Sequence, residues 1–152
     1  MAGKKVRPTA AEVIAGECLA VRVKTLSRAI SSLYDEVLRP LGLRGGQFSL
    51  LVAVARTGTA RPGDLCRILR MDKSTLSRDV EVMRRNGWLE VDDSGGGRAR
   101  PLRLTRSGEA LLESAVPAWR QAQARARALL GDEVAAALGV AVDRLWREGD
   151  GG

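Results

Sequence analysis

Two short helical patterns joined by a three-residue turn lie in the middle of the chain, and this arrangement constrains the fold more than any other feature. Pro62 suits the first position of the first helix, because an N–H is not needed there. Asp72 suits the N-cap of the second helix, residues 73–86, because its carboxylate can accept hydrogen bonds from the free amides of the first turn. Three apolar residues of the second helix share its inward face: Leu76, Val80 and Met83. The pattern predicts a helix-turn-helix with small polar and basic side chains on the outer face.

Two short segments of alternating apolar and polar residues, 88–91 and 102–104, follow the second helix. The residues between them are rich in glycine and include Arg98 and Arg100, which predicts a β-hairpin with a basic tip. A helix-turn-helix followed by such a hairpin is a winged helix. Its second helix fits the major groove of DNA, and the hairpin tip can reach the adjacent minor groove or the backbone. A solvated polar face is the simpler interpretation of each segment alone, but the ordered set favours nucleic acid.

Amphipathic helices flank this central region. A long helix is expected over residues 9–38, because apolar residues recur there at spacings of three and four: Leu19, Val23, Leu26, Ile30, Leu33 and Val37. A buried helix is expected at residues 46–56. Another helix begins after Thr105, and beyond Gly131 a last short helix carries Val134, Leu138, Val142 and Leu145. The predicted fold is mainly α with a small β-wing, in the order α-α-β-α-α-β-β-α-α.

The scarce residue types exclude most kinds of enzyme. Histidine is absent, which excludes Ser-His-Asp and Cys-His catalysis and zinc sites of the His-Glu-x-x-His type. Cys18 and Cys66 form no Cys-x-x-Cys pair, so neither a metal site nor a disulfide framework is expected. Aromatic residues make up 3% of the chain, so the core is expected to be aliphatic. We therefore expect a protein that is not an enzyme and binds no metal or cofactor.

The net charge of +7 is unevenly distributed along the chain. The basic excess lies at the N-terminus and in the predicted winged helix, whereas residues 107–152 are net acidic. This asymmetry indicates nucleic acid rather than a membrane as the partner, because no basic amphipathic surface helix stands out. The longest uncharged run, Gly45–Ala55, is shorter than the roughly 20 apolar residues of a membrane span. A cytoplasmic protein is expected, since two free thiols suit a reducing compartment.

Five short stretches occur in an order and at a spacing that are specific together, although each alone is weak. They are Arg39-Pro-Leu-Gly-Leu43, Gln47-Phe-Ser-Leu-Leu51, Asp72-Lys-Ser-Thr-Leu-Ser-Arg78, Met83-Arg-Arg-Asn-Gly-Trp-Leu89 and Leu104-Thr-Arg-Ser-Gly108. With these stretches the chain resembles the MarR family of bacterial transcription regulators, from about Glu17 to Leu145. The resemblance implies a single domain over residues 1–152, with a winged helix-turn-helix at 46–106 and a helical dimerisation region at 9–40 and 107–148.

In that family the protein is a homodimer whose first and last helices interlock, and each winged helix contacts one half-site of a palindromic DNA operator. The resemblance implies that DNA is contacted by Lys73, Ser74, Thr75, Ser77, Arg78, Arg98 and Arg100. It implies that the dimer is held together by Leu19, Val23, Leu26, Leu129, Val134, Leu138 and Leu145. The family usually has an aspartate two residues before the wing arginine, where this chain has Gly96, and Asp93 is the available substitute.

Three further residues have alternative interpretations. Cys18 lies roughly where the hydroperoxide-sensing branch of the family keeps a reactive thiol, although a small hydrophobic role is the more common one. Trp119 either lines a ligand cavity or fills the dimer core, and the scarcity of aromatic residues favours the core. Phe48 is the second candidate for the ligand cavity. We expect a repressor that a small aromatic or phenolic ligand releases from DNA. The alternatives are a thiol-based stress sensor on the same scaffold and an interaction module without DNA binding.

Overall fold

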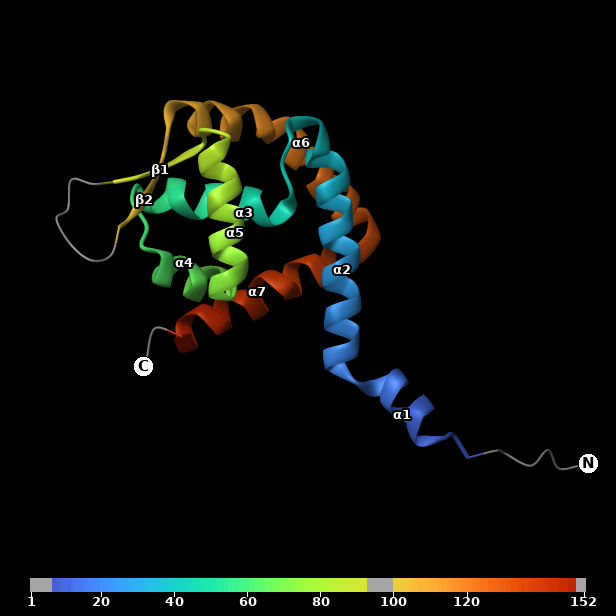
Figure 1. Ribbon diagram of the computed structural model, residues 1–152. Coiled ribbons are helices and arrows are strands. Elements are labelled where there is room, and N and C mark those ends of the chain that lie inside the picture. The colour runs from blue at the N-terminus through green and yellow to red at the C-terminus, as the bar shows by residue number, and fades with distance from the viewer. Residues whose placement is uncertain (1–6, 93–99, 150–152) are drawn as a thin grey trace, which may run out of the picture. The chain divides into compact units, whose positions relative to one another are not determined.

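The computed structural model describes residues 7–92 and 100–149, and their side chains up to Leu145 (Figure 1). Arg98, Gly96 and Asp93, on which the sequence makes predictions, lie outside these residues. The described residues form seven α-helices, one short 3-10 helix and two strands, which is the predicted mainly helical fold with a small β-wing. The chain divides into two compact units, residues 1–32 and 33–152, and each is described by itself.

The first unit contains α1, Ala10–Glu17, and the N-terminal part of α2, Leu19–Leu38. Thr9 and Glu12 cap α1 reciprocally: the Thr9 hydroxyl accepts from the Glu12 N–H at 3.3 Å, and the Glu12 carboxylate accepts from the Thr9 N–H at 2.7 Å. The prediction of one helix over residues 9–38 is wrong, because Cys18 has an extended backbone with φ −67° and ψ 110°. Gly16 favours a break here, since glycine inside a helix costs about 1 kcal/mol relative to alanine.

In the second unit, the end of α2 is tied to α3, Gly45–Thr57. After Leu38 the chain turns through the 3-10 helix Arg39–Leu41 and through Gly42, whose φ of +71° suits glycine. The Asp35 carboxylate then accepts a hydrogen bond from the backbone N–H of Gly45 at 2.6 Å. The apolar sequence of α3 predicts burial, and three of its side chains are completely buried: Leu50, Leu51 and Val54.

The predicted helix-turn-helix consists of α4, Pro62–Leu69, and α5, Lys73–Arg85, and α5 packs across α3 (Figure 1). Pro62 is the first residue of α4, as predicted. The turn between the helices contains Arg70, whose φ of +51° is left-handed and is normally adopted by glycine or asparagine. The guanidinium of Arg70 also donates to the backbone carbonyl of Leu145 at 3.2 Å, which links the turn to the last helix, residues 132–149.

The wing consists of β1, Leu89–Val91, and β2, Leu102–Leu104, which pair antiparallel. Leu89 and Leu102 are buried and attach the wing to the core. The prediction of a separate strand between the second and third helices is wrong. Among the described residues of that segment, only Ala60 pairs, in a single bridge with Leu102. Because Pro62 begins α4 two residues later, the segment has no length for a strand.

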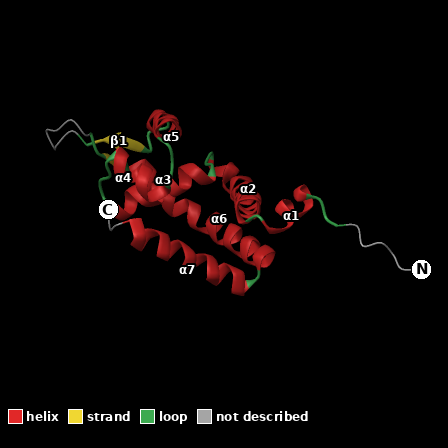
Figure 2. Cartoon of the chain, turned by 90° about the horizontal axis from the view of Figure 1, so that it is seen from below, coloured by secondary structure: helices red, strands yellow, loops and turns green. Residues whose placement is uncertain are grey.

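The last two helices, α6, Arg106–Leu130, and α7, Asp132–Gly149, pack against each other (Figure 2). α6 continues through Pro117 and ends at Leu130, with Gly131 as its C-cap. The prediction of a short last helix is wrong, since α7 has 18 residues. Near the end of α2, the Glu36 carboxylate pairs with the Arg125 guanidinium of α6 at 3.1 Å. α6 therefore contacts α2 and α7, and it also contacts α3 and β2 of the winged helix.

The core of the second unit is aliphatic, as the scarcity of aromatic residues predicts. Its largest completely buried side chains are Leu38, Leu43, Leu50, Leu51, Leu65, Met83 and Val54. Ala115 of α6 is also completely buried and belongs to the same cluster. The winged helix and the first half of α6 thus share one core, which leaves the outer face of α5 in solvent.

Candidate nucleic-acid interface

The helix predicted to enter the major groove, α5, presents a polar face to solvent. Its inward residues are buried or half-buried: Leu76, Val80 and Met83. Of the residues predicted to contact DNA, the exposed ones on this helix are Lys73, Ser74, Ser77 and Arg78, whereas Thr75 is half-buried. The structure therefore brings these five residues together on one helix, and four of them reach solvent.

Asp72 organises the first turn of α5. Its carboxylate accepts from the Thr75 N–H at 2.9 Å, from the Ser74 hydroxyl at 2.5 Å and from the Thr75 hydroxyl at 2.7 Å. The hydrogen bond from Ser74, followed by those from Thr75, holds the pKa of the Asp72 carboxyl well below its usual value of 3.8. Arg78, one turn later, donates to the Ser74 oxygen at 3.4 Å. The N-cap predicted from the sequence is confirmed, and it also holds two of the predicted DNA-contacting residues.

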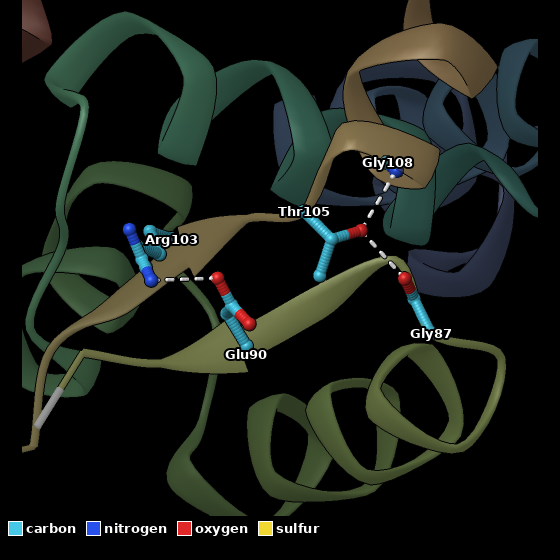
Figure 3. Close-up of polar contacts among 5 residues, drawn as sticks. All are labelled: Gly87, Glu90, Arg103, Thr105 and Gly108. Carbon is cyan, nitrogen blue, oxygen red and sulfur yellow. Dashed lines mark hydrogen bonds and ion pairs between the residues drawn. The ribbon is translucent and has the colours of Figure 1, made fainter.

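A groove separates the C-terminal end of α5 from the wing. Its lining residues are Glu81, Arg84, Arg85, Leu89, Glu90, Val91 and Arg100. Arg100 is thus placed beside two arginines that the sequence analysis did not select, although adjacent arginines in the last turn of the predicted helix were a visible signal. Within the wing, an ion pair joins the two strands: the Glu90 carboxylate lies 2.9 Å from the Arg103 guanidinium (Figure 3).

Thr105 joins the end of the helix-turn-helix to the start of α6 (Figure 3). Its hydroxyl donates to the carbonyl of Gly87 at 2.5 Å and accepts from the N–H of Gly108 at 3.0 Å. Its own N–H donates to the carbonyl of Trp88 at 3.1 Å. The predicted cap of α6 is confirmed, and the same residue fixes where α6 begins relative to the turn that ends α5.

Two comparisons with known sequences point to one family. A sequence model of the MarR family matches residues 41–99, which contain α3, the helix-turn-helix and β1. The multiple antibiotic resistance protein MarR of Salmonella typhimurium is 28% identical over 106 residues, or 68% of this chain and 74% of MarR. The regulator YwoH of Bacillus subtilis is 24% identical over 88 residues, and this chain spans 64% of its length.

A comparison with solved structures covers more of the chain. The transcriptional regulator MosR of M. tuberculosis, in complex with DNA, is 32% identical, with a TM-score of 0.72 over 86% of this chain and 98% of MosR. The chain belongs to the MarR family. A variant of MarR from E. coli complexed with operator DNA is 20% identical and has the same fold, with a TM-score of 0.75 over 88% of this chain and 97% of that one. The MarR family consists of transcription regulators, which confirms that the chain is not an enzyme.

This MarR-family chain contains an apolar cavity of about 530 Å³. Phe48 and Trp119, the two candidate ligand residues, both line it. The remaining lining residues come from α2, α3, α4 and α6: Tyr34, Ser49, Val52, Ala53, Arg56, Ile68, Leu69, Leu112 and Val116. Trp119 is 37% exposed and lines this cavity, and its predicted place in a dimer core stays a prediction. The other lining residues were not predictable from the sequence, because the periodicity of one helix does not show a space where four helices meet.

Large apolar side chains are exposed on the helices that the MarR resemblance assigns to dimerisation. In the second unit, Leu129 is 60% exposed, and three residues of α7 are exposed as well: Val134, Leu138 and Leu145. In the first unit, Leu19 is 75% exposed, Val23 is exposed and Leu26 is half-buried. Soluble monomers rarely leave such apolar stripes in water. The role of these residues in a dimer stays a prediction.

The two cysteines are free and half-buried. Cys18 lies at the extended residue between α1 and α2. Cys66 is on α4 and packs against the core. A redox role for Cys18 stays a prediction. Within residues 7–92 and 100–149, no helix combines the length and the hydropathy needed to span a bilayer.

Proposed function

We propose that this chain is a cytoplasmic, homodimeric repressor that binds a palindromic operator in double-stranded DNA and is released by a small aromatic or phenolic ligand. The observation that carries the proposal is the exposed polar face of α5, with Ser74, Ser77 and Arg78, on a helix-turn-helix related to that of a regulator solved in complex with DNA. A helix with such a face fits the major groove and can reach the edges of the bases.

The exposed apolar residues support the homodimer. The stripe on α7 and the end of α6, with Leu129 and Leu138, is exposed to solvent in the described part of the second unit. Its burial against a second copy removes apolar surface from water. A two-fold dimer carries two copies of α5, and this symmetry requires a palindromic site.

The cavity supports release by a ligand. It touches α4 through Ile68 and Leu69, and it touches α6 through Val116 and Trp119. A molecule that occupies it contacts both the helix-turn-helix and a predicted dimerisation helix, so it can favour one relative placement of the two over another. Phe48 and Trp119 favour an aromatic ligand, and the guanidinium of Arg56 favours one with a negative or phenolic oxygen.

The test is selection of bound duplexes from a random DNA library by the full-length protein, followed by titration of the selected duplex at several salt concentrations. We expect a palindrome with half-sites about 10 base pairs apart. The logarithm of the binding constant should fall with the logarithm of the salt concentration with a slope of about −5 or steeper, because the proposed complex brings two copies each of Arg78, Arg98 and Arg100 to the DNA. Failure to enrich any sequence, with weak binding that salt does not change, would instead indicate an interaction module without DNA binding.

A thiol-based sensor on the same scaffold is the second candidate, because Cys18 is free and partly accessible at a helix break. Binding to the same selected duplex, measured with and without hydroperoxide, tests this second candidate. A sensor loses DNA binding when treated with hydroperoxide, and Cys18→Ser prevents the loss. A wild-type protein that keeps its affinity after the treatment contradicts this candidate.

A further inference from the structure

The two hydroxyl groups in the first turn of α5, those of Ser74 and Thr75, are both hydrogen-bonded to the carboxylate of the N-cap residue Asp72. The Ser74 oxygen lies 2.5 Å from Oδ1 of Asp72, and the Thr75 oxygen lies 2.7 Å from Oδ2. An ionised carboxylate only accepts hydrogen bonds, so the two hydroxyls are the donors. The low pKa of Asp72 keeps the carboxylate ionised at neutral pH. The direction of these hydrogen bonds is therefore set by chemistry as well as by geometry.

A hydroxyl group has one proton and two lone pairs. Because the only O–H of Ser74 is used in the hydrogen bond to Asp72, Ser74 can contact any other group only as an acceptor. Thr75 is restricted in the same way, but it is half-buried, whereas Ser74 is exposed on the outer face. Ser77 is also exposed, and within the described part of the chain its hydroxyl has no hydrogen bond, so it can rotate to donate or to accept.

An acceptor without a proton distinguishes the bases in the major groove. The donors there are the N6 amino group of adenine and the N4 amino group of cytosine. Guanine presents O6 and N7, and thymine presents O4, all of which are acceptors. If the Ser74 oxygen faced guanine or thymine, two acceptors would face each other, and their lone pairs would repel.

We propose that Ser74 is a specificity-determining residue that requires adenine or cytosine at the base it contacts, and that Asp72 is the positioning residue that makes it a pure acceptor. This inference rests on the proposed function, because it needs α5 to lie in the major groove. Arg78 has donors only, and it selects guanine, whose major-groove edge has only acceptors. Two residues four positions apart on α5 thus specify opposite kinds of base.

The contact between Arg78 and Ser74 does not prevent the Ser74 oxygen from also accepting a hydrogen bond from a base. Arg78 donates to the Ser74 oxygen at 3.4 Å, which is long for a hydrogen bond and uses one of the two lone pairs. The second lone pair is available to a base. If Ser74 acted only by holding Arg78, its removal would instead affect the base that Arg78 contacts.

The test uses three full-length proteins, wild type, Ser74→Ala and Ser77→Ala, on the duplex selected by the wild type. Each base pair of the half-site is varied in turn, and in a second series the amino group of each preferred adenine or cytosine is deleted with purine or 2-pyrimidinone. Ser74→Ala keeps the bond from the Thr75 N–H to Asp72, so the helix cap remains. Thermal melts check that both variants fold.

We expect one position per half-site at which the wild type prefers adenine or cytosine and loses about three- to tenfold in affinity when the amino group is deleted. Ser74→Ala should be insensitive to that deletion, whereas Ser77→Ala should keep the full sensitivity. The inference is overturned if Ser74→Ala changes no base preference, if it relaxes a guanine or thymine position, or if Ser77→Ala abolishes the same preference. A wild type that selects no sequence at all overturns the proposed function, and the inference falls with it.

Discussion

A β-carbon added to Gly108 would lie 2.1 Å from the carbonyl oxygen of Trp88. β-carbons essentially never approach atoms outside their own and the neighbouring residues so closely, and the atom in the way belongs to the backbone. The same carbonyl accepts the N–H of Thr105, whose hydroxyl is bonded to both Gly87 and Gly108. The start of α6 is therefore packed directly on the turn that follows α5, and only glycine fits at the point of contact.

Gly108→Ala should consequently destabilise the fold. The backbone of Trp88 must move to make room, and overpacking of this kind costs about 1–3 kcal/mol of the free energy of unfolding. Gly63→Ala is the matched control, because a β-carbon there meets nothing within 4 Å. Urea unfolding measures both variants. Equal stability of the two would show that α6 does not rest on the Trp88 backbone.

Asp72→Ala should lower the midpoint temperature of unfolding at pH 7 and have little effect in acid. Hydrogen bonds from Ser74 and Thr75 lower the pKa of Asp72 in the folded protein below its ordinary value of 3.8. A carboxyl group whose pKa is lowered by folding stabilises the fold at any pH above its unfolded pKa. As the pH falls from the unfolded pKa to below the folded pKa, the carboxylate is protonated and this contribution to stability is lost.

Thermal melts from pH 7 to pH 2 check this expectation. The difference between wild type and Asp72→Ala should be constant down to about pH 4 and then shrink. Asp72→Asn is the control, because asparagine is also a good N-cap and should be less destabilising at pH 7. A difference that grows in acid would contradict the assigned hydrogen bonds.

Most elements of the fold were predictable because their signals act locally. Pro62, Asp72 and Thr105 each begin a helix through their own backbone or side-chain chemistry, and all three do so in the structure. Cys18 carries no comparable signal. The apolar residues recur at helical spacing from Leu19 onward, and Gly16 alone is not enough to predict that Cys18 has an extended backbone.

The candidate site was predictable only in part. The outer face of α5 follows from helical periodicity, so the exposure of Ser74, Ser77 and Arg78 could be anticipated. The hydrogen bond that Asp72 accepts from Ser74 depends on side-chain torsions in one turn, and the cavity around Trp119 depends on the packing of four helices. Neither property is encoded in the spacing of residues along one element.

Leu138→Glu should convert a dimer into a monomer or an aggregate. Leu138 is exposed on α7, and a carboxylate there cannot be buried against a second copy without a large desolvation cost. Sedimentation should show a stable wild-type dimer at micromolar concentration. Ala55→Glu, which introduces the same carboxylate at an exposed position of α3, should leave the dimer intact. A folded wild-type monomer at that concentration would rule out the proposed assembly.

An aromatic acid should bind in the cavity next to Trp119. Benzoate added to the full-length protein should change the tryptophan fluorescence, and Trp119→Phe should remove most of the change while retaining binding. Arg56→Ala should weaken benzoate more than phenol, because the guanidinium lines the cavity and favours the full negative charge. Unchanged fluorescence of the wild type, together with no binding by calorimetry, would argue against this ligand class.

The central claim is that α5 recognises the DNA sequence, and a competition assay with the selected operator and a scrambled duplex at fixed salt tests it most directly. Arg78→Ala should lose about 1–3 kcal/mol of binding free energy on the operator and much less on the scrambled duplex. Arg98→Ala, which removes a wing charge, should weaken binding to both duplexes by similar factors. Thermal melts should show that both variants remain folded, since Arg78 is exposed. A loss by Arg78→Ala that is equal on the two duplexes would mean that this residue contacts only phosphate, and would contradict the assignment of α5 as the recognition helix.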